Sequence, residues 1–319
     1  MTIAWIIGAG GLLGSALWRS LSFDGTELFS PPERFCWGSE PELEPQVAAA
    51  VQASADRVNA ARRWEIYWAA GVGTMGSSES ELALETRALA LLLRRVESES
   101  RLMATPGTIA FASSAGAIYA GSSAYHITED TAAAPTTAYA REKLTQEDLV
   151  RSFVVANSRT TALVARFSTL YGPGQSLGKR QGLVAHIARC ILRNHVIQIY
   201  VPFDMIRDYI TADDAAAATV AALRSTSEKP RALMKIVASE RPTTIAEIIS
   251  VFRRIARRPP RIVTSASSLS KLYSRRVLFQ SRLLQASTPA SRTSLFVGIS
   301  QVMNAERVAF ARSPGAQHG

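Results

Sequence analysis

The chain has 319 residues, which is enough to bury a large core and to divide into two unequal domains. Hydrophobic residues make up 47% and charged residues 19%, so the composition excludes a disordered chain and is typical of a globular protein. The net charge of +10 suits phosphorylated substrates, and the basic runs in 252–282 lack the interleaved aromatic residues of a nucleic-acid platform, so we expect no nucleic-acid partner.

Segments with strand and helix patterns alternate through the first two thirds of the chain. Short apolar runs rich in β-branched or aromatic residues predict strands at 2–8, 34–38, 65–71, 108–116 and 160–172. Helical periodicity predicts helices at 11–21, 46–63, 81–98 and about 137–155. This alternation implies right-handed crossovers, so the predicted fold class is α/β with a doubly wound parallel sheet, a Rossmann fold.

The pattern loosens after residue 172. Further helices are predicted at 182–194, 213–225 and 243–258, and a short strand at 196–201. We predict a dinucleotide-binding domain of residues 1–172, to which 205–226 returns. Residues 173–204 and 227–312 would form a smaller C-terminal α/β region that binds substrate, and 313–319 a disordered tail.

A glycine-rich loop joins the first predicted strand to the first predicted helix. The loop is residues 8–14, and its candidate binding residues are Gly8, Gly10, Gly11, Leu12, Leu13 and Gly14. Glycine allows a tight turn and a close approach of the backbone to a pyrophosphate, and the N–H groups that begin the helix would face this anion. The spacing also allows the last glycine to pack the helix on the strand. The loop therefore predicts a dinucleotide site.

The residues after the second predicted strand leave the choice of dinucleotide open. An acid usually holds the adenosine ribose there, but only Ser39 and Glu40 follow 34–38. A missing acid would leave room for a 2′-phosphate, and Arg34 is nearby. Both NAD and NADP therefore stay possible.

The localisation of the protein is predicted from its cysteines and its first residues. Cys36 and Cys190 show no pairing pattern, which favours a reducing cytoplasm. Residues 3–18 superficially resemble a signal peptide, but no Lys or Arg precedes them and glycines interrupt them regularly. No other stretch reaches the length of a membrane span. We expect a soluble cytoplasmic protein without a membrane partner.

Two further motifs carry hydroxyl groups. Ser113 and Ser114 end a predicted strand, and Tyr139 and Lys143 stand four residues apart on one face of a predicted helix. A nearby ammonium favours the phenolate of a tyrosine whose pKa is otherwise about 10, so the pair could move a proton. The alternatives are a chance Tyr-Lys spacing and serines that only satisfy the end of a strand.

Taken in order, these motifs resemble the short-chain dehydrogenase/reductase superfamily, in particular its extended branch of nucleotide-sugar epimerases, dehydratases and reductases. The resemblance covers nearly the whole chain. The other matching elements are Tyr67-Trp68-Ala69-Ala70, Ile118-Tyr119, His126 to Asp130, Pro135, Arg166, Tyr171 to Gln175, Arg207 to Ile210 and Asp213-Asp214.

The resemblance implies a role for each candidate residue. Tyr139 would be the acid/base, Lys143 would lower its pKa and hold the cofactor ribose, and Ser114, or alternatively Ser113, would orient the substrate oxygen. The cofactor would also contact the glycine loop and Ala69, Ala70 and Gly71. The substrate would contact Ser114, Thr169, Tyr171, Gln175 and Arg207. Arg207 would clamp a diphosphate, unless it forms a salt bridge with Asp208 or Asp213.

Departures from the family pattern narrow the reaction. Ala115-Gly116 replaces the Asp-Glu pair of the dehydratases, so dehydration is not expected. Glu85 and Thr169 each stand where the family usually has Asn, and a Gly-Asp-Leu element near the adenine is missing.

Three functions remain. They are a nucleotide-sugar 4-epimerase, for which NAD is favoured, an NADPH-dependent reductase of a nucleotide-linked keto-sugar, and a dinucleotide-binding regulatory protein without turnover. Retention of Tyr139 and Lys143 argues against the third, because a sensor needs no proton donor. The resemblance also implies a homodimer through the helix of Tyr139. The histidines show no metal spacing, with His126 expected in a surface loop and His186 in the core.

Overall fold

The computed structural model describes residues 2–58, 63–71, 73–175, 182–225, 231–264, 276–283 and 292–312. Its centre is a six-stranded sheet in the order β2-β1-β3-β4-β5-β9, in which all neighbouring strands are parallel. The strands are β1 (Thr2–Ile7), β2 (Glu27–Phe29), β3 (Arg63–Trp68), β4 (Gly107–Ser114), β5 (Thr160–Phe167) and β9 (Ala232–Val237). The predicted Rossmann sheet is therefore confirmed.

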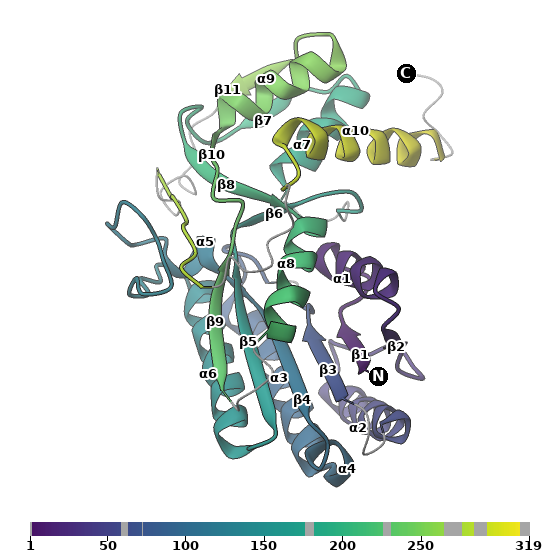
Figure 1. Ribbon diagram of the computed structural model, residues 1–319. Coiled ribbons are helices and arrows are strands. Elements are labelled where there is room, and N and C mark those ends of the chain that lie inside the picture. Colours follow the sequence, from purple (N-terminus) through teal and green to yellow (C-terminus); the bar gives the residue numbers. More distant parts are fainter. Residues whose placement is uncertain are drawn as a thin grey trace.

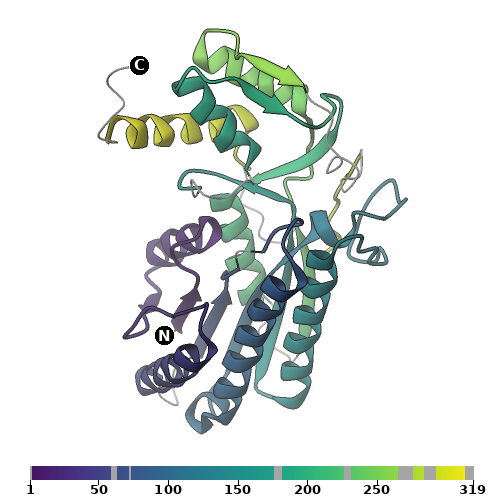
Figure 2. The same ribbon diagram turned by 180° about the vertical axis from the view of Figure 1, so that it is seen from behind.

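Helices cover both faces of this sheet (Figures 1 and 2). On one face pack α2 (Glu40–Arg57), α3 (Glu79–Ser98) and α6 (Ala138–Ala156), and on the other α1 (Leu12–Phe23) and α8 (Ala212–Ser225). The short helices α4 (Ser100–Met103) and α5 (Ala115–Ile118) follow α3 and β4. Because successive side chains of a strand face opposite sides, burial of both faces explains why the strands are largely apolar.

A second region continues from the end of β5. It contains a three-stranded sheet of β10 (Pro242–Thr244), β8 (Ile206–Thr211) and β6 (Thr169–Tyr171), and a pair of β11 (Ile262–Thr264) and β7 (Ile197–Ile199). The helices α7 (Leu183–Leu192), α9 (Ile245–Ala256) and α10 (Leu295–Arg312) share an apolar core with these strands. This region lies beyond the carboxyl ends of the central strands (Figure 1). None of the helices in the described part of the chain is long and apolar enough to cross a membrane.

The prediction of a second strand at 34–38 is wrong. The strand beside β1 is β2, and 34–38 belongs to the loop that follows it. The apolar signal comes from aromatic packing instead: the ring centroids of Trp5 and Phe35 lie 6.3 Å apart, those of Phe35 and Trp37 5.3 Å, and those of Trp37 and Trp68 6.1 Å. The residue that directly follows β2 is therefore Ser30.

Other differences are smaller. The predicted strand 160–172 is divided between β5 and β6, which belong to different sheets. His186 is exposed on α7 rather than buried in the core, while His126 is exposed as expected. The sequence patterns predicted neither β9 nor α10. The predicted tail, residues 313–319, lies outside the described residues.

Candidate active site

The glycine loop packs closely against the loop that follows β3. Gly8 has a φ of +90°, and a Cβ on it would lie 2.6 Å from the backbone N of Ala70. A Cβ on Gly14 would lie 2.1 Å from the Gly8 carbonyl oxygen, so neither position accepts a side chain. Gly11 donates its N–H to that same oxygen at 2.9 Å and begins α1 as its N-cap. The sequence pattern therefore fixes both a turn and a backbone contact between β1 and β3.

This arrangement fits a dinucleotide. A Cβ on Gly10 would meet no atom within 4 Å, so the loop presents bare backbone to open space beside the N-terminus of α1. Backbone N–H groups at such a helix start favour an anion. The sheet order also changes direction at β1 and β3, and ligands of α/β sheets bind where the order reverses. Gly10, Gly11, Leu12 and the Ala69-Ala70 loop are thus suited to hold a cofactor.

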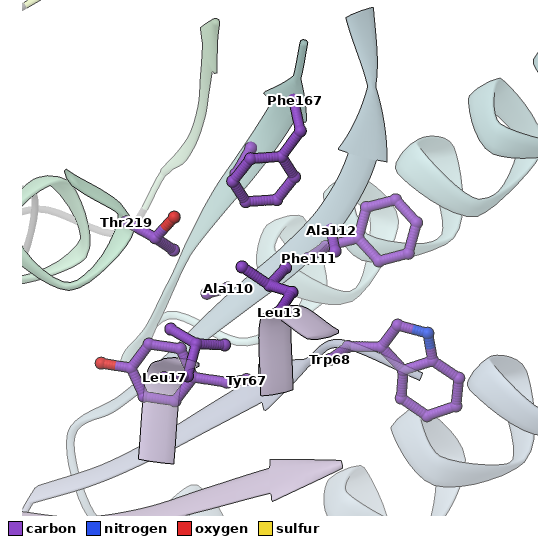
Figure 3. A pocket seen from close by; sticks show the side chains of 10 residues that line it. Leu13, Leu17, Tyr67, Trp68, Ala110, Phe111, Ala112, Phe167 and Thr219 are labelled. Atoms are coloured by element: carbon purple, nitrogen blue, oxygen red, sulfur yellow. The ribbon is translucent and has the colours of Figure 1, made fainter. Parts of the chain in front are cut away.

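A small apolar pocket lies between α1 and the central strands β3, β4 and β5 (Figure 3). Leu13 and Leu17 of α1 line it, together with Ala110 and Ala112 of β4 and Phe167 of β5. Leu13 is buried, so its side chain belongs to the core, and only its backbone remains available at the helix start. None of the candidate catalytic side chains lines this pocket.

Ser114 and Tyr139 form the first half of the candidate catalytic cluster. Ser114 is the last residue of β4 and the N-cap of α5, and its hydroxyl accepts a hydrogen bond from the N–H of Ala117 at 3.4 Å. Tyr139 lies in the first turn of α6, which is capped by Thr137. Burial first, and then the negative charge of Glu85, raise the pKa of Tyr139 to about 12, while a hydrogen bond with Ser114 opposes this rise.

Lys143 completes the cluster from the next turn of α6. Its ammonium is buried, lies 5.8 Å from the ring centroid of Tyr139, and donates to Oε1 of Gln146 at 2.8 Å. Burial lowers the pKa of Lys143, and Glu85 opposes that change. The structure therefore brings together three predicted residues from the end of one strand and the face of one helix.

Glu85 of α3 also belongs to the candidate catalytic cluster, which we define as Ser114, Tyr139, Lys143 and Glu85. One carboxylate oxygen of Glu85 lies 4.0 Å from Nζ of Lys143, and the other accepts the N–H of Gly73 at 2.5 Å. The sequence marked this residue only as a departure from the usual Asn. Its position links Lys143 to the loop after β3.

Ser113, the alternative catalytic serine, belongs to a different set of residues. Its hydroxyl is buried and donates to Oε1 of Glu147 at 2.6 Å. Arg166 binds both carboxylate oxygens of Glu147, at 2.8 and 2.6 Å, and donates to the Tyr119 hydroxyl at 2.6 Å. We call Ser113, Tyr119, Glu147 and Arg166 the buried ion cluster. Glu147 is one turn beyond Lys143 on α6, and sequence reasoning missed it because a buried acid looks like any helix-surface acid.

The predicted substrate residues lie in the second region and differ in exposure. Thr169 is exposed on β6, whereas Tyr171 is buried, with its ring 6.3 Å from that of Tyr209. α10 covers Tyr171, because a Cβ on Gly298 would lie 2.2 Å from the tyrosine hydroxyl. Gln175 is partly buried, and its backbone carbonyl oxygen accepts a hydrogen bond from the Arg189 guanidinium.

Arg207 on β8 is partly exposed, and the two acids considered as its partners are engaged elsewhere. Asp208 is buried and accepts hydrogen bonds from Ser168 at 2.6 Å, from the N–H and hydroxyl of Ser239, and from the Arg241 N–H. Asp213 pairs with Arg19 at 2.5 Å. An isolated β-bridge joins Ile206, the residue before Arg207, to Arg276, so a second arginine lies next to this strand.

Known proteins resemble this chain in sequence. A model of the NAD dependent epimerase/dehydratase family matches residues 4–236. A dTDP-L-rhamnose 4-epimerase from Burkholderia thailandensis is 34% identical over 119 residues, which are 37% of this chain and 32% of the relative. A dTDP-4-dehydro-6-deoxyglucose reductase from Escherichia coli is 31% identical over 115 residues, 36% of each chain. The matches thus span about a third of the length of these relatives.

Solved structures share the fold at low identity. UDP-glucose 4-epimerase from Thermus thermophilus in complex with NAD has a TM-score of 0.79 and 18% identity, and covers 97% of this chain and 100% of its own. RMD from Pseudomonas aeruginosa, complexed with NADPH, has a TM-score of 0.76 and 19% identity with the same coverage. At such identity the similarity concerns the fold alone.

Proposed function

Because the chain belongs to the NAD dependent epimerase/dehydratase family, we propose that it is a nucleotide-sugar 4-epimerase that uses Tyr139 as its acid/base. The observation that carries the proposal is the candidate catalytic cluster. A serine hydroxyl, a phenol and a buried ammonium converge at the carboxyl end of β4, and Glu85 joins them to the loop that packs on the glycine turn. This is the set of groups needed to move one proton at a sugar hydroxyl.

Three residues of the candidate catalytic cluster have a task in this proposal, and Arg207 of the second region has another. The bound nicotinamide would take up and return a hydride. Tyr139 accepts the proton of the sugar hydroxyl at its Oη and returns it after the sugar has turned. Ser114 orients the same sugar oxygen by a hydrogen bond. Lys143 supplies a positive charge that favours the phenolate, against the burial and the Glu85 charge that raise the pKa of Tyr139. Arg207, partly exposed on β8, would bind the substrate diphosphate.

A second candidate is an NADPH-dependent reductase of a nucleotide-linked keto-sugar. Two observations favour it. The pKa of Tyr139 near 12 keeps the proton on the phenol, which is the form required to protonate a ketone oxygen during reduction. Ser30, not an acid, directly follows β2, and Arg34 lies exposed in the same loop, which would suit a 2′-phosphate.

The absorbance and fluorescence of the purified protein separate these candidates. NAD that stays bound through gel filtration, together with interconversion of UDP-glucose or a dTDP-sugar at C4, would support the epimerase. Release of the cofactor, with oxidation of added NADPH on dTDP-4-dehydro-6-deoxyglucose, would support the reductase. Both enzymatic proposals fail if Tyr139→Phe retains full activity.

The oligomeric state is part of the proposal. We propose a homodimer through the outer surfaces of α3 and α6, which pack against each other in one protomer. Two exposed apolar side chains, Leu84 of α3 and Val155 of α6, lie on these helices. Light scattering during gel filtration should give twice the mass of one chain, and Val155→Glu should lower it if this surface forms the interface.

A further inference from the structure

Glu85 introduces a negative charge into the candidate catalytic cluster at a point that the proposed reaction does not require. Its side chain is 12% exposed, and one oxygen lies 4.0 Å from the Lys143 ammonium. A Cβ on Gly71 would lie 3.2 Å from the same carboxylate, and the N–H of Gly73 donates to it. Two glycines of the loop after β3 thus leave room for this acid, which reaches from α3 to α6.

The two other acids close to Lys143, Glu147 and Glu142, form hydrogen bonds with other side chains. Glu147, the acid one turn along α6, is committed to Arg166 and Arg151. Glu142 accepts a hydrogen bond from Thr86, and Thr86 in turn accepts from Gln146, the side chain that holds Lys143. Among the charged groups that act on Tyr139 and Lys143, Glu85 is thus the one that touches both the lysine and the cofactor-side loop.

We propose that Glu85 is a positioning residue that anchors Lys143 and keeps the proton on the Tyr139 hydroxyl, so that the resting site is set to donate a proton to a ketone oxygen of the substrate. This inference rests on the second candidate function, the reductase, because its substrate carries the ketone that a protonated phenol serves. An ammonium next to a phenol favours loss of the phenolic proton, and a carboxylate beside that ammonium cancels much of the effect. The proton stays at Tyr139 Oη until the substrate oxygen receives it.

Glu85→Gln separates the charge of this residue from its structural contact. The amide oxygen of glutamine can still accept the Gly73 N–H, so the loop keeps its anchor while the charge disappears. Glu79→Gln is the matched control, since Glu79 lies on the same helix but its side chain is 86% exposed. Glu85→Asn, with the residue usual in the family, gives a second test if the first variant folds poorly.

The direct measurement is the ionisation of Tyr139, read as tyrosinate absorbance in the parent protein minus that in its Tyr139→Phe variant. Glu85→Gln should lower the midpoint by on the order of one pH unit, and Glu79→Gln should leave it unchanged. In turnover near neutral pH, Glu85→Gln should raise the kcat of oxidation relative to the kcat of reduction. A midpoint that stays in place in both Glu85 variants would overturn the inference.

The two failures can be told apart. If the midpoint shifts but no nucleotide sugar is converted, the charge effect stands and the proposed function is wrong. If a sugar is converted but the midpoint does not move, the function stands and Glu85 acts only as a loop anchor.

Discussion

The candidate catalytic cluster and the buried ion cluster lie one helical turn apart on α6, and both contain a serine of β4, a tyrosine, and a charged pair. In the buried ion cluster the charges are matched: Arg166 binds both oxygens of Glu147, and Ser113 and Tyr119 use their hydroxyls on this pair. In the candidate catalytic cluster, Nζ of Lys143 and a carboxylate oxygen of Glu85 lie 4.0 Å apart, and Tyr139 and Ser114 are partly exposed.

Under the proposed function, this difference separates a structural from a catalytic use of similar residues. A fully hydrogen-bonded buried pair stabilises one arrangement, and loss of one partner leaves the other charge buried. A loosely paired, partly exposed cluster keeps hydroxyl groups available to a substrate and holds the pKa of Tyr139 away from its ordinary value. Substitutions in the two clusters should therefore differ in whether they change turnover or stability.

The largest expected effect is on turnover. Tyr139→Phe removes the only hydroxyl proposed to carry the proton, so kcat should fall by about 10²- to 10⁴-fold. The thermal midpoint should change little, because the ring remains and Tyr139 is partly exposed. Steady-state kinetics and calorimetry of the same preparation measure both quantities. A large loss of stability would instead mean that Tyr139 has a structural role.

Arg166→Ala should have the opposite effect, with a large loss of stability. It leaves the Glu147 carboxylate buried without its bidentate partner, which costs about 3–5 kcal/mol of unfolding free energy. Urea denaturation monitored by fluorescence gives this value. The control is Arg151→Ala, which removes a half-exposed partner of the same acid and should cost less than about 1 kcal/mol. Equal losses in the two variants would contradict the assignment of Arg166 as the main partner.

The pH dependence of the two reaction directions should differ. Because burial and Glu85 raise the pKa of Tyr139 to about 12, the phenol stays protonated over the neutral range. Reduction, which needs the phenol, should therefore be independent of pH there, whereas oxidation, which needs the phenolate, should rise about tenfold per pH unit. Initial rates with excess cofactor and sugar, measured in each direction, test this. An oxidative rate that is flat from about pH 6 to 9 would mean that the phenolate is already formed.

The sequence predicted the parts of this molecule that depend on local pattern. The glycine loop, the strand ends and the Tyr139–Lys143 spacing each require particular residue types at fixed separations, so one segment alone reveals them. Four of the six strands of the central sheet were predictable for the same reason, because they are buried on both faces and largely apolar.

The parts that failed depend on contacts between distant segments. The aromatic run 34–38 has the composition of a strand, but its rings pack on Trp5 and Trp68 while the shorter β2 makes the hydrogen bonds. Glu147 and Arg166 are 19 residues apart and look like ordinary charged residues until α6 packs on β5. Glu85 was noticed only as a departure, since its effect on Lys143 arises from the contact of α3 with α6.

The smallest expected effects concern the adjacent serines Ser113 and Ser114, both of which the sequence offers as the serine that orients the substrate oxygen. Ser113→Ala removes one hydrogen bond to the buried Glu147 carboxylate, so it should cost about 1.5–3 kcal/mol of unfolding free energy and leave kcat nearly unchanged. Ser114→Ala should have little effect on stability beyond the cap of α5, but it should lower kcat because the substrate oxygen loses its hydrogen bond. Measuring both quantities in both variants gives a crossed pattern, and an inverted pattern would transfer the catalytic role to Ser113. The two side chains face opposite sides of the same strand, so one position in sequence decides which cluster a hydroxyl joins.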